Sequence, residues 1–160
     1  MLTVNDRHVI QAELSAVFDC VWNAGLWPKI TPHVMRVNIV ESDDHTQKML
    51  MTVLSNGAEH HVESLRKADP QRRVTYTQTR PPAFLKAHSG EWHFDAVAEG
   101  VRVDLVHHAV VDYDQALPAL NVRSHAEADA LISSMLKANG ARTLLAIKDY
   151  LERQGDRSAE

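Results

Sequence analysis

The feature that most constrains the fold is a series of strand-like segments followed by one long helical segment. Residues 124–154 contain no proline and carry apolar residues along one side at helical spacing. This apolar stripe consists of Ile132, Met135, Leu136, Ala146, Ile147 and Tyr150. Because a helix with a single apolar stripe must bury that stripe, we expect it to lie on the sheet that the preceding strands form.

The strands are predicted from β-branched and aromatic residues that alternate with polar ones between turn signals. The predicted strands are 3–10, 34–42, 46–54, 59–68, 73–79, 88–96 and 101–112. The turn signals between the later strands are Asn56-Gly57, Asp69-Pro70, Pro81-Pro82 and Glu99-Gly100. After the first strand, Ser15 is the expected cap of a helix over 16–23, and Pro28 is an early residue of a second short helix.

These elements predict an α+β domain with the helix-grip arrangement. A strongly curved antiparallel sheet of about seven strands wraps around the long C-terminal helix, and two short helices follow the first strand. The chain of 160 residues has the size of one domain, which we expect over 1–154 with a polar tail over 155–160.

The composition excludes several classes of function. A net charge of -4 argues against nucleic-acid binding, and no apolar stretch approaches the ~20 residues of a membrane span. The single cysteine, Cys20, and an N-terminus without a secretory pattern fit a cytoplasmic protein. The adjacent histidines of 60–61 and 107–108 point to opposite faces of their strands, so neither pair can hold one metal ion. We therefore expect neither a metal nor another cofactor.

Two polar residues fall on strand faces that the alternation assigns to the interior. Arg66 follows Val62 and Ser64 on one face, and His107 follows apolar residues of the last strand. Both side chains cost free energy to bury unless they are paired or hydrogen-bonded. Arg66 is either a rim residue whose charged head reaches water or an internal acid, or a fixed donor inside a ligand cavity. His107 is either a hydrogen-bonded core histidine or a proton-transfer group.

Further candidates lie on the long helix and among the aromatic residues. Asn139 and Thr143 follow the apolar stripe and are either ordinary helix-face polar groups or hydrogen-bond partners for ligand oxygens. Four aromatic side chains are either core or cavity wall. They are Trp27, Tyr76, Trp92 and Phe94.

The order of short motifs along the chain resembles that of the tetracenomycin-type aromatase/cyclases, which are START-like polyketide cyclases. The motifs are Trp27-Pro28, Ser55-Asn56-Gly57, Glu63-Ser64-Leu65-Arg66, Asp69-Pro70-Gln71-Arg72-Arg73-Val74, Ser89-Gly90-Glu91-Trp92, Val103-Asp104-Leu105-Val106-His107 and Asn139. Each piece alone is weak, but the ordered set covers nearly the whole chain and is fairly specific.

The resemblance implies the regioselective aldol cyclisation and dehydration of a poly-β-ketone held on an acyl carrier protein. On the same basis, Ser64, Arg66, Trp92, His107 and Asn139 match cavity residues of the family, and Trp27 matches an aromatic residue near the cavity mouth. The chain departs from the family where a common tryptophan is Val62, a frequent aspartate is His108 and an acidic helix position is Thr143.

Chemically, Arg66 can supply the oxyanion donor and His107 can move the proton in such an aldol closure. The alternative is a non-catalytic carrier of a lipid, quinone or aromatic metabolite with the same fold. A third possibility, an interaction domain that uses the outer face of the sheet, is disfavoured by the polar character of that face. For an acidic carrier protein, we expect a basic docking rim at the loop that carries Arg80 and Lys86.

Overall fold

The computed structural model describes residues 1–159, and the side chains of residues 1–157. Its strands form one antiparallel sheet in the order β1-β7-β6-β5-β4-β3-β2. They are β1 (Leu2–Ile10), β2 (Val34–Ser42), β3 (Thr46–Ser55), β4 (Ala58–Asp69), β5 (Arg73–Arg80), β6 (Leu85–Val97) and β7 (Gly100–Val111). The seven strands of the sheet confirm the predicted architecture.

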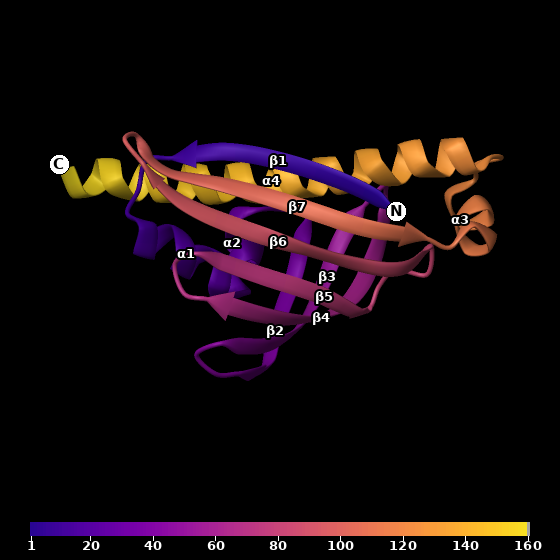
Figure 1. Ribbon diagram of the computed structural model, residues 1–160, viewed down its shortest axis with the longest axis horizontal. Helices are drawn as coiled ribbons and strands as arrows, with labels where there is room; N and C mark the ends of the chain where they lie inside the picture. Colours follow the sequence, from indigo (N-terminus) through magenta and orange to yellow (C-terminus); the bar gives the residue numbers. More distant parts are fainter. Residues whose placement is uncertain (160) are drawn as a thin grey trace.

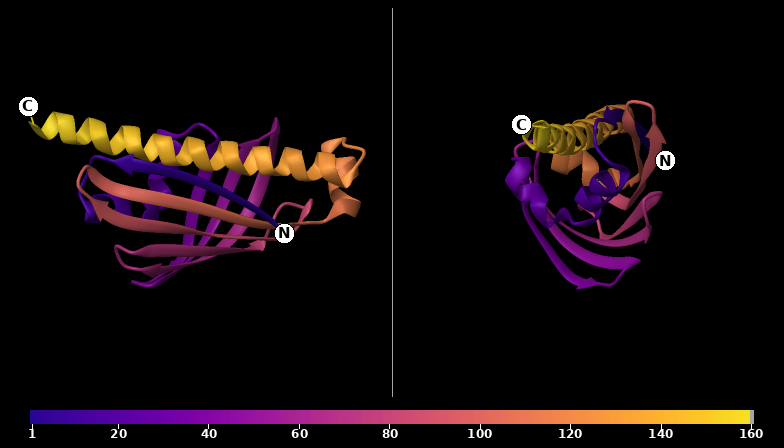
Figure 2. Two further views of the ribbon diagram at one scale, coloured as in Figure 1. Left: turned by 45° about the horizontal axis from the view of Figure 1, so that its top comes forward. Right: turned by 90° about the vertical axis from the view of Figure 1, so that its left-hand side faces the viewer.

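The helices lie at two places in the chain. Between β1 and β2 are α1 (Leu14–Trp22), the 3-10 turn η1 (Ala24–Leu26) and α2 (Trp27–Ile30), and after β7 are α3 (Tyr113–Leu120) and α4 (His125–Ala159). Figure 1 shows α4 running along the whole molecule beside β1. In the end-on view of Figure 2 the sheet is curved and α4 lies across its open side, which is the predicted helix-grip arrangement.

Three details differ from the sequence-based expectation. The N-cap of α1 is Glu13, whose carbonyl accepts a hydrogen bond from Val17, so Ser15 lies inside the helix and its prediction as the cap is wrong. The predicted tail over 155–160 continues α4 to Ala159. The additional helix α3 ends at Asn121, which adopts the left-handed conformation with φ 54°.

The start of α4 is fixed by local hydrogen bonds. The Ser124 hydroxyl accepts a hydrogen bond from the Glu127 amide at 3.1 Å, and the Glu127 carboxylate accepts one from the Arg123 amide at 2.9 Å. These bonds satisfy backbone donors that an uncapped helix would leave unpaired.

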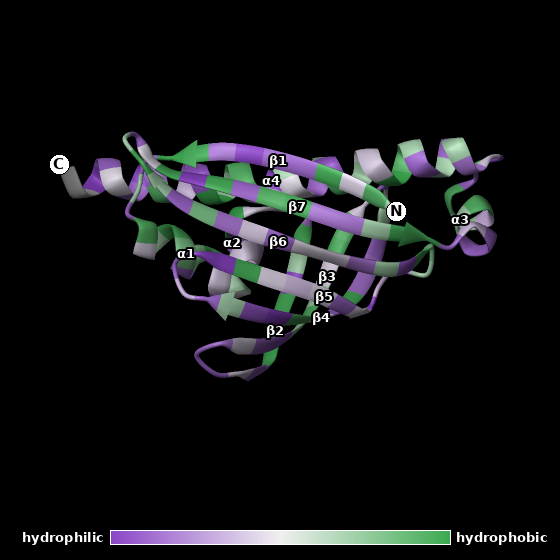
Figure 3. Cartoon of the chain, viewed as in Figure 1, coloured by the Kyte–Doolittle hydropathy of each residue, from purple (hydrophilic) through white to green (hydrophobic). Residues whose placement is uncertain are grey.

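The predicted alternation of strand faces is visible in the hydropathy colouring of Figure 3. On β6, the four residues His88, Gly90, Trp92 and Phe94 are buried, and the residues between them are less so. On β4, Val62, Ser64 and Arg66 are likewise buried. The polar residues on these inner faces are therefore held inside the domain, as expected.

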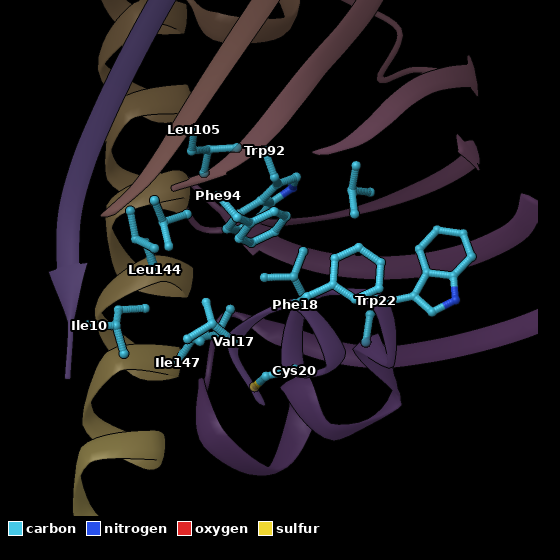
Figure 4. Close-up of a cluster of buried hydrophobic side chains, with 14 of the residues drawn as sticks. Ile10, Val17, Phe18, Cys20, Trp22, Trp92, Phe94, Leu105, Leu144 and Ile147 are labelled. Atoms are coloured by element: carbon cyan, nitrogen blue, oxygen red, sulfur yellow. The ribbon is translucent and has the colours of Figure 1, made fainter. Parts of the chain in front are cut away.

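Two apolar clusters pack beneath the two ends of α4. One joins α1 to the C-terminal half of α4, and Figure 4 shows its members Phe18, Phe94, Leu144 and Ile147 between these helices and the sheet. The other joins α3, Phe84 and the N-terminal half of α4. Residues around the middle of α4, from Ile132 to Thr143, also line a cavity, and Ile132 and Leu136 belong to the second cluster as well.

Candidate functional site

A cavity of about 990 Å³, measured with its opening to solvent, lies between the curved sheet and the middle of α4. Strands β2 to β7 form its floor, and α2 and α4 complete the wall. Most of its lining is apolar or aromatic, and several of the polar side chains contact one another. A cavity of this kind suits a largely apolar ligand whose orientation depends on a few polar contacts.

Arg66 lies in the cavity wall, on the inner face of β4, and is 2% exposed. Its Nη2 donates to the Val21 carbonyl at 2.6 Å, and Nη1 donates to the Trp22 carbonyl at 3.2 Å and to Gln47 Oε1 at 2.7 Å. Since these carbonyls belong to the last turn of α1, the guanidinium caps that helix and meets the negative end of its dipole. Arg66 thus joins α1 to the sheet.

The positive charge of Arg66 has no acidic side chain within ion-pair distance among the described residues. Burial lowers the pKa of the guanidinium to about 9, which still leaves it charged at neutral pH. Its carbon Cζ lies 5.4 Å from the ring centre of Trp22 and 5.5 Å from that of Trp27, so two aromatic rings offset part of the desolvation. The cavity wall therefore carries a net positive charge here.

On another part of the wall, the Tyr76 hydroxyl lies between two histidines. Tyr76 comes from β5, His88 from β6 and His107 from β7. The hydroxyl lies 3.0 Å from His88 Nε2 and forms a short hydrogen bond with His107 Nδ1. The other nitrogen of His107, Nε2, is buried and has no hydrogen-bond partner among the described residues.

Burial keeps both of these histidines uncharged at neutral pH. Together with smaller effects of His107 on His88 and of His108 on both, it lowers the pKa of His107 to about 4 and that of His88 to about 3. The Asp6 carboxylate acts in the opposite sense on His107. Burial also raises the pKa of Tyr76, so its hydroxyl keeps its proton.

A third histidine, His33, lines the cavity directly before β2, where its side chain contacts α4. Its Nδ1 lies 2.7 Å from the Thr31 hydroxyl, and its Nε2 lies 3.1 Å from the Thr143 hydroxyl. Because the Thr143 hydroxyl donates its proton to the Asn139 carbonyl at 3.0 Å, it can only accept from His33. His33 therefore carries its proton on Nε2, and burial, with a smaller effect of Arg142, lowers its pKa to about 4.

The remaining polar candidates differ in how many of their hydrogen bonds are already made. Asn139 Nδ2 donates to the Ser55 hydroxyl at 3.1 Å. Ser64 is 3% exposed and lines the cavity, and its hydroxyl makes no hydrogen bond to another described side chain or carbonyl. Gln78 lines the cavity with its Oε1 buried and unpartnered among the described residues. Ser64 and Gln78 are therefore available to a polar ligand.

The structure separates the four predicted aromatic residues. Trp27, Tyr76 and Trp92 line the cavity, and the rings of Trp27 and Trp92 lie 5.9 Å apart. Phe94 does not join them, because it packs edge-on against Phe18 at 5.7 Å in the core beneath α1. The alternation placed Phe94 on the inner face correctly, but the position of α1 decides that this part of the face is filled.

The predicted docking residues lie outside the cavity lining. Arg80, at the end of β5, has a side chain that is 82% exposed, and its Nε lies 3.5 Å from the Glu63 carboxylate. Lys86 is an exposed residue of β6. Pro82, Phe84 and Leu85 in the same segment line the cavity, so this loop contributes both to its wall and to the nearby surface.

Sequence reasoning did not identify His33, His60, Gln78 or His88 as candidate site residues, although all line the cavity. For His88 the signal was present, because the alternation of its strand placed it inward. His33 lies in a short connection after α2, where no periodicity predicts a direction.

Two further properties concern the described residues as a whole. They contain no group of three or more His, Cys, Asp or Glu side chains that could hold a metal ion. None of their helices is both long enough and apolar enough to cross a membrane.

Comparison with protein families gives a match over residues 1–152 to the family described as polyketide cyclase / dehydrase and lipid transport. The chain belongs to this family. This finding agrees with the resemblance that the motif order indicated, and the helix-grip fold is the one expected for START-like members.

The curated relatives are longer proteins. The granaticin polyketide synthase bifunctional cyclase/dehydratase of Streptomyces virginiae is 34% identical over 95 residues, which cover 59% of this chain and 31% of that protein. The protein of the same name from Streptomyces violaceoruber is 25% identical over 147 residues, which cover 90% of this chain and 45% of the relative. The chain thus spans less than half the length of these relatives.

Solved structures show the same relation. The di-domain ARO/CYC BexL matches with a TM-score of 0.86 and 30% identity, over 94% of this chain and 50% of BexL. The Zhui aromatase/cyclase from a Streptomyces species matches with a TM-score of 0.85 and 21% identity, over 96% of this chain and 94% of that structure. The second likeness shows that the shared fold extends over nearly all of both chains.

Proposed function

We propose that this chain is an aromatase/cyclase that directs the first aldol ring closures and dehydrations of a poly-β-ketone bound in its cavity. The observation that carries the proposal is the combination, in one largely apolar cavity, of an arginine without an acidic partner and uncharged histidines. Membership of the polyketide cyclase / dehydrase family and the names of the curated relatives support it.

The chemistry of an aldol closure matches this combination. A carbon between two carbonyls loses a proton, the resulting enolate attacks a second ketone, and the new alkoxide takes up a proton. Because His88 and His107 are neutral near pH 7, they can accept the first proton and return it to the oxygen. No net proton or electron is gained or lost in this step.

Arg66 supplies the charge that the enolate requires. A buried cation without a counter-ion is destabilised, and an anion that forms in the same cavity relieves that cost. The guanidinium is held in place by α1 before substrate binds, so its position costs no reorganisation during the reaction. We assign it mainly a long-range electrostatic role, because most of its bonds to the protein are already made.

The walls select the folding of the substrate. Trp27 and Trp92 are rigid aromatic surfaces, and Ser64 and Gln78 have unused polar groups that can bind two carbonyl oxygens of the chain. A free poly-β-ketone can close in several ways, so a cavity that admits one conformer decides the product. Subsequent loss of water from the ring alcohol needs one proton removed from carbon and one delivered to the hydroxyl, which the same histidines can provide.

Reconstitution with a minimal polyketide synthase and its carrier protein tests the proposal. We expect one first-ring regioisomer to become dominant, whereas the reaction without this chain gives a mixture. Binding that quenches the fluorescence of Trp27 and Trp92 but leaves the mixture unchanged would contradict the proposal and support the alternative of a non-catalytic carrier.

Delivery of the substrate by an acyl carrier protein is a separate part of the proposal. The surface beside the cavity wall carries Arg80 and Lys86, which can attract an acidic carrier. The double substitution Arg80→Glu and Lys86→Glu should raise KM for a carrier-bound substrate but not for a small soluble mimic. Arg157→Glu, toward the far end of α4, is the matched charge-reversal control and should change neither value. If the double substitution changes KM equally for the carrier-bound substrate and for the small mimic, the docking surface lies elsewhere.

A further inference from the structure

The cluster of Tyr76, His88 and His107 has a property that follows from counting protons. The Tyr76 hydroxyl contacts one nitrogen of each ring, His88 Nε2 at 3.0 Å and His107 Nδ1 at a shorter distance. A phenol has a single proton to donate, so it can donate to only one of these nitrogens. It must accept a hydrogen bond from the other one, which therefore carries a proton.

Two arrangements of equal charge satisfy this condition. In the first, Tyr76 donates to His107 Nδ1, and His107 carries its own proton on Nε2. In the second, Tyr76 donates to His88 Nε2, and His107 donates from Nδ1, which leaves its Nε2 as a bare acceptor. Whether His107 Nε2 carries a proton therefore depends on the direction of the hydrogen bond between Tyr76 and His88.

The surrounding backbone is shaped to keep the three rings in contact. A Cβ atom on Gly90 would lie 2.5 Å from the Tyr76 hydroxyl and 2.3 Å from the Val106 carbonyl oxygen. A Cβ atom on Gly140 of α4 would lie 2.7 Å from His107 Nε2. All three distances are far below van der Waals contact, so glycine at these two positions makes room for the cluster.

The charged and titratable groups near His107 come from several elements. Asp6 of β1 interacts electrostatically with it, and Lys137 of α4 lies 3.8 Å from the Asp6 carboxylate. His108 is its neighbour in β7, and Tyr76 and His88 complete the set from β5 and β6. Of these, only Tyr76 makes a direct hydrogen bond to the His107 ring.

We propose that Tyr76 is a positioning residue that couples His88 and His107 into one unit with complementary tautomers, so that His107 Nε2 alternates between proton donor and proton acceptor. The catalytic meaning of this coupling rests on the proposed function, because the same ring has to take a proton from carbon and return it to oxygen. The coupling itself is a property of the free protein and does not depend on any activity.

Imidazole nitrogen-15 NMR tests the coupling without substrate, because protonated and bare ring nitrogens have well-separated chemical shifts. We expect one of the two nitrogens His88 Nε2 and His107 Nδ1 to be protonated and the other to be bare. If the two arrangements exchange rapidly, both shifts should be averaged, and the fractional protonations of the two nitrogens should add up to one. Finding both nitrogens fully protonated, or both fully bare, would overturn the proposal in the native protein, with no substitution needed.

Tyr76→Phe removes the shared proton and should change the tautomer populations of both histidines. The matched control is Tyr113→Phe, whose hydroxyl donates to Asp129 at 2.7 Å outside the cavity lining and whose loss should leave both histidines unchanged. If Tyr76→Phe is folded by circular dichroism and its imidazole shifts equal those of the native protein, the coupling is absent.

Steady-state kinetics then distinguish a positioning role of Tyr76 from a purely structural one. Tyr76→Phe should lower kcat on the order of tenfold or more and leave KM within about twofold, since proton transfer acts in the transition state. If Tyr76→Phe changes the tautomers of the histidines but not kcat, the positioning role is wrong, although the coupling between the histidines is still present. If the native protein shows complementary tautomers but directs no cyclisation, the proposed function fails and the coupling stands.

Discussion

Around Arg66 and around Tyr76, the sequence places a polar residue on the inner face of a strand. The structure gives these two parts of the cavity wall different hydrogen bonds. Arg66 donates to two α1 carbonyls and to Gln47, so its donors are largely committed to the fold. His107 instead has one nitrogen shared with Tyr76 and another that is buried without a partner among the described residues. The comparison teaches that stability should depend more on the arginine and chemistry more on the histidines.

The largest expected effect is on stability at Arg66. Arg66→Met keeps much of the side-chain volume but leaves the Val21 carbonyl and Gln47 Oε1 without their donor, whereas the Trp22 carbonyl keeps its hydrogen bond from Gln47 Nε2 at 3.0 Å. Each buried unpaired group costs about 1 to 3 kcal/mol, so we expect the free energy of unfolding to fall by about 2 to 6 kcal/mol. Urea denaturation measures this change.

Two further variants sharpen the result at Arg66. Arg102→Met removes an arginine that pairs with Asp95 and Asp104 on the outer side of the sheet, and it should change stability little. Arg66→Lys keeps the charge but not the forked geometry, and its stability should lie between those of the native protein and Arg66→Met. Native stability in Arg66→Met would show that the contacts with α1 contribute little.

Acid should destabilise the fold through the buried histidines. The pKa values of His33, His88 and His107 are about 4, 3 and 4 in the folded protein, below the value of about 6.5 for an unfolded chain. The unfolded state therefore binds more protons between these values, so stability is fully present above pH ~6.5 and is lost as pH falls. We expect a loss of about 1 kcal/mol or more per ring by pH ~5.

Urea denaturation at several pH values between ~7 and ~5 measures this loss. His88→Phe removes one buried ionisable ring and should flatten the dependence of the unfolding free energy on pH. If the unfolding free energy of the native protein does not change with pH over this range, the histidines are not held neutral by burial, and the contrast with Arg66 fails.

Gly140→Ala tests the space that His107 requires. In an exposed helix this substitution usually stabilises by up to about 1 kcal/mol, but here the new Cβ atom would lie 2.7 Å from His107 Nε2. We expect a net loss of about 1 to 2 kcal/mol and altered imidazole shifts of His107. Thermal unfolding together with NMR measures both.

Gly155→Ala on the same helix is the control for that prediction. A Cβ atom at this position has no neighbour within 4 Å, so helix propensity alone should act, with a gain of about 0.5 to 1 kcal/mol. If the two substitutions change stability equally, Gly140 has no special role beside His107.

The smallest effect concerns the third histidine. Thr143→Val keeps the shape of the side chain but removes the hydroxyl that accepts from His33 Nε2. We expect a loss of about 1 kcal/mol, because the buried N–H of His33 loses this acceptor. Urea denaturation checks the loss, and Thr52→Val, at a hydroxyl that contacts the exposed His61, is the comparison that should show a smaller change.

The sequence allowed much of the candidate site to be predicted, because strand alternation assigns a direction to each side chain. Ser64, Arg66, Trp92 and His107 all lie in the cavity wall as their strand positions indicated. Alternation says nothing about depth along the face, so it left Phe94 as either core or cavity wall, and α1 fills that part of the sheet with Phe18. The catalytic and binding roles of Ser64, Arg66, Trp92 and His107 remain predictions.

The sequence by itself determined the order of the elements, the helix-grip architecture and the inward faces, because these depend on periodicity and turn signals within each segment. Only the tertiary structure decided which partner each inward polar group has. Arg66 meets carbonyls of a helix more than forty residues before it, and Tyr76 meets His107 thirty-one residues after it. Such contacts depend on the curvature of the sheet and on where α1 and α4 pack, and no local pattern encodes those distances.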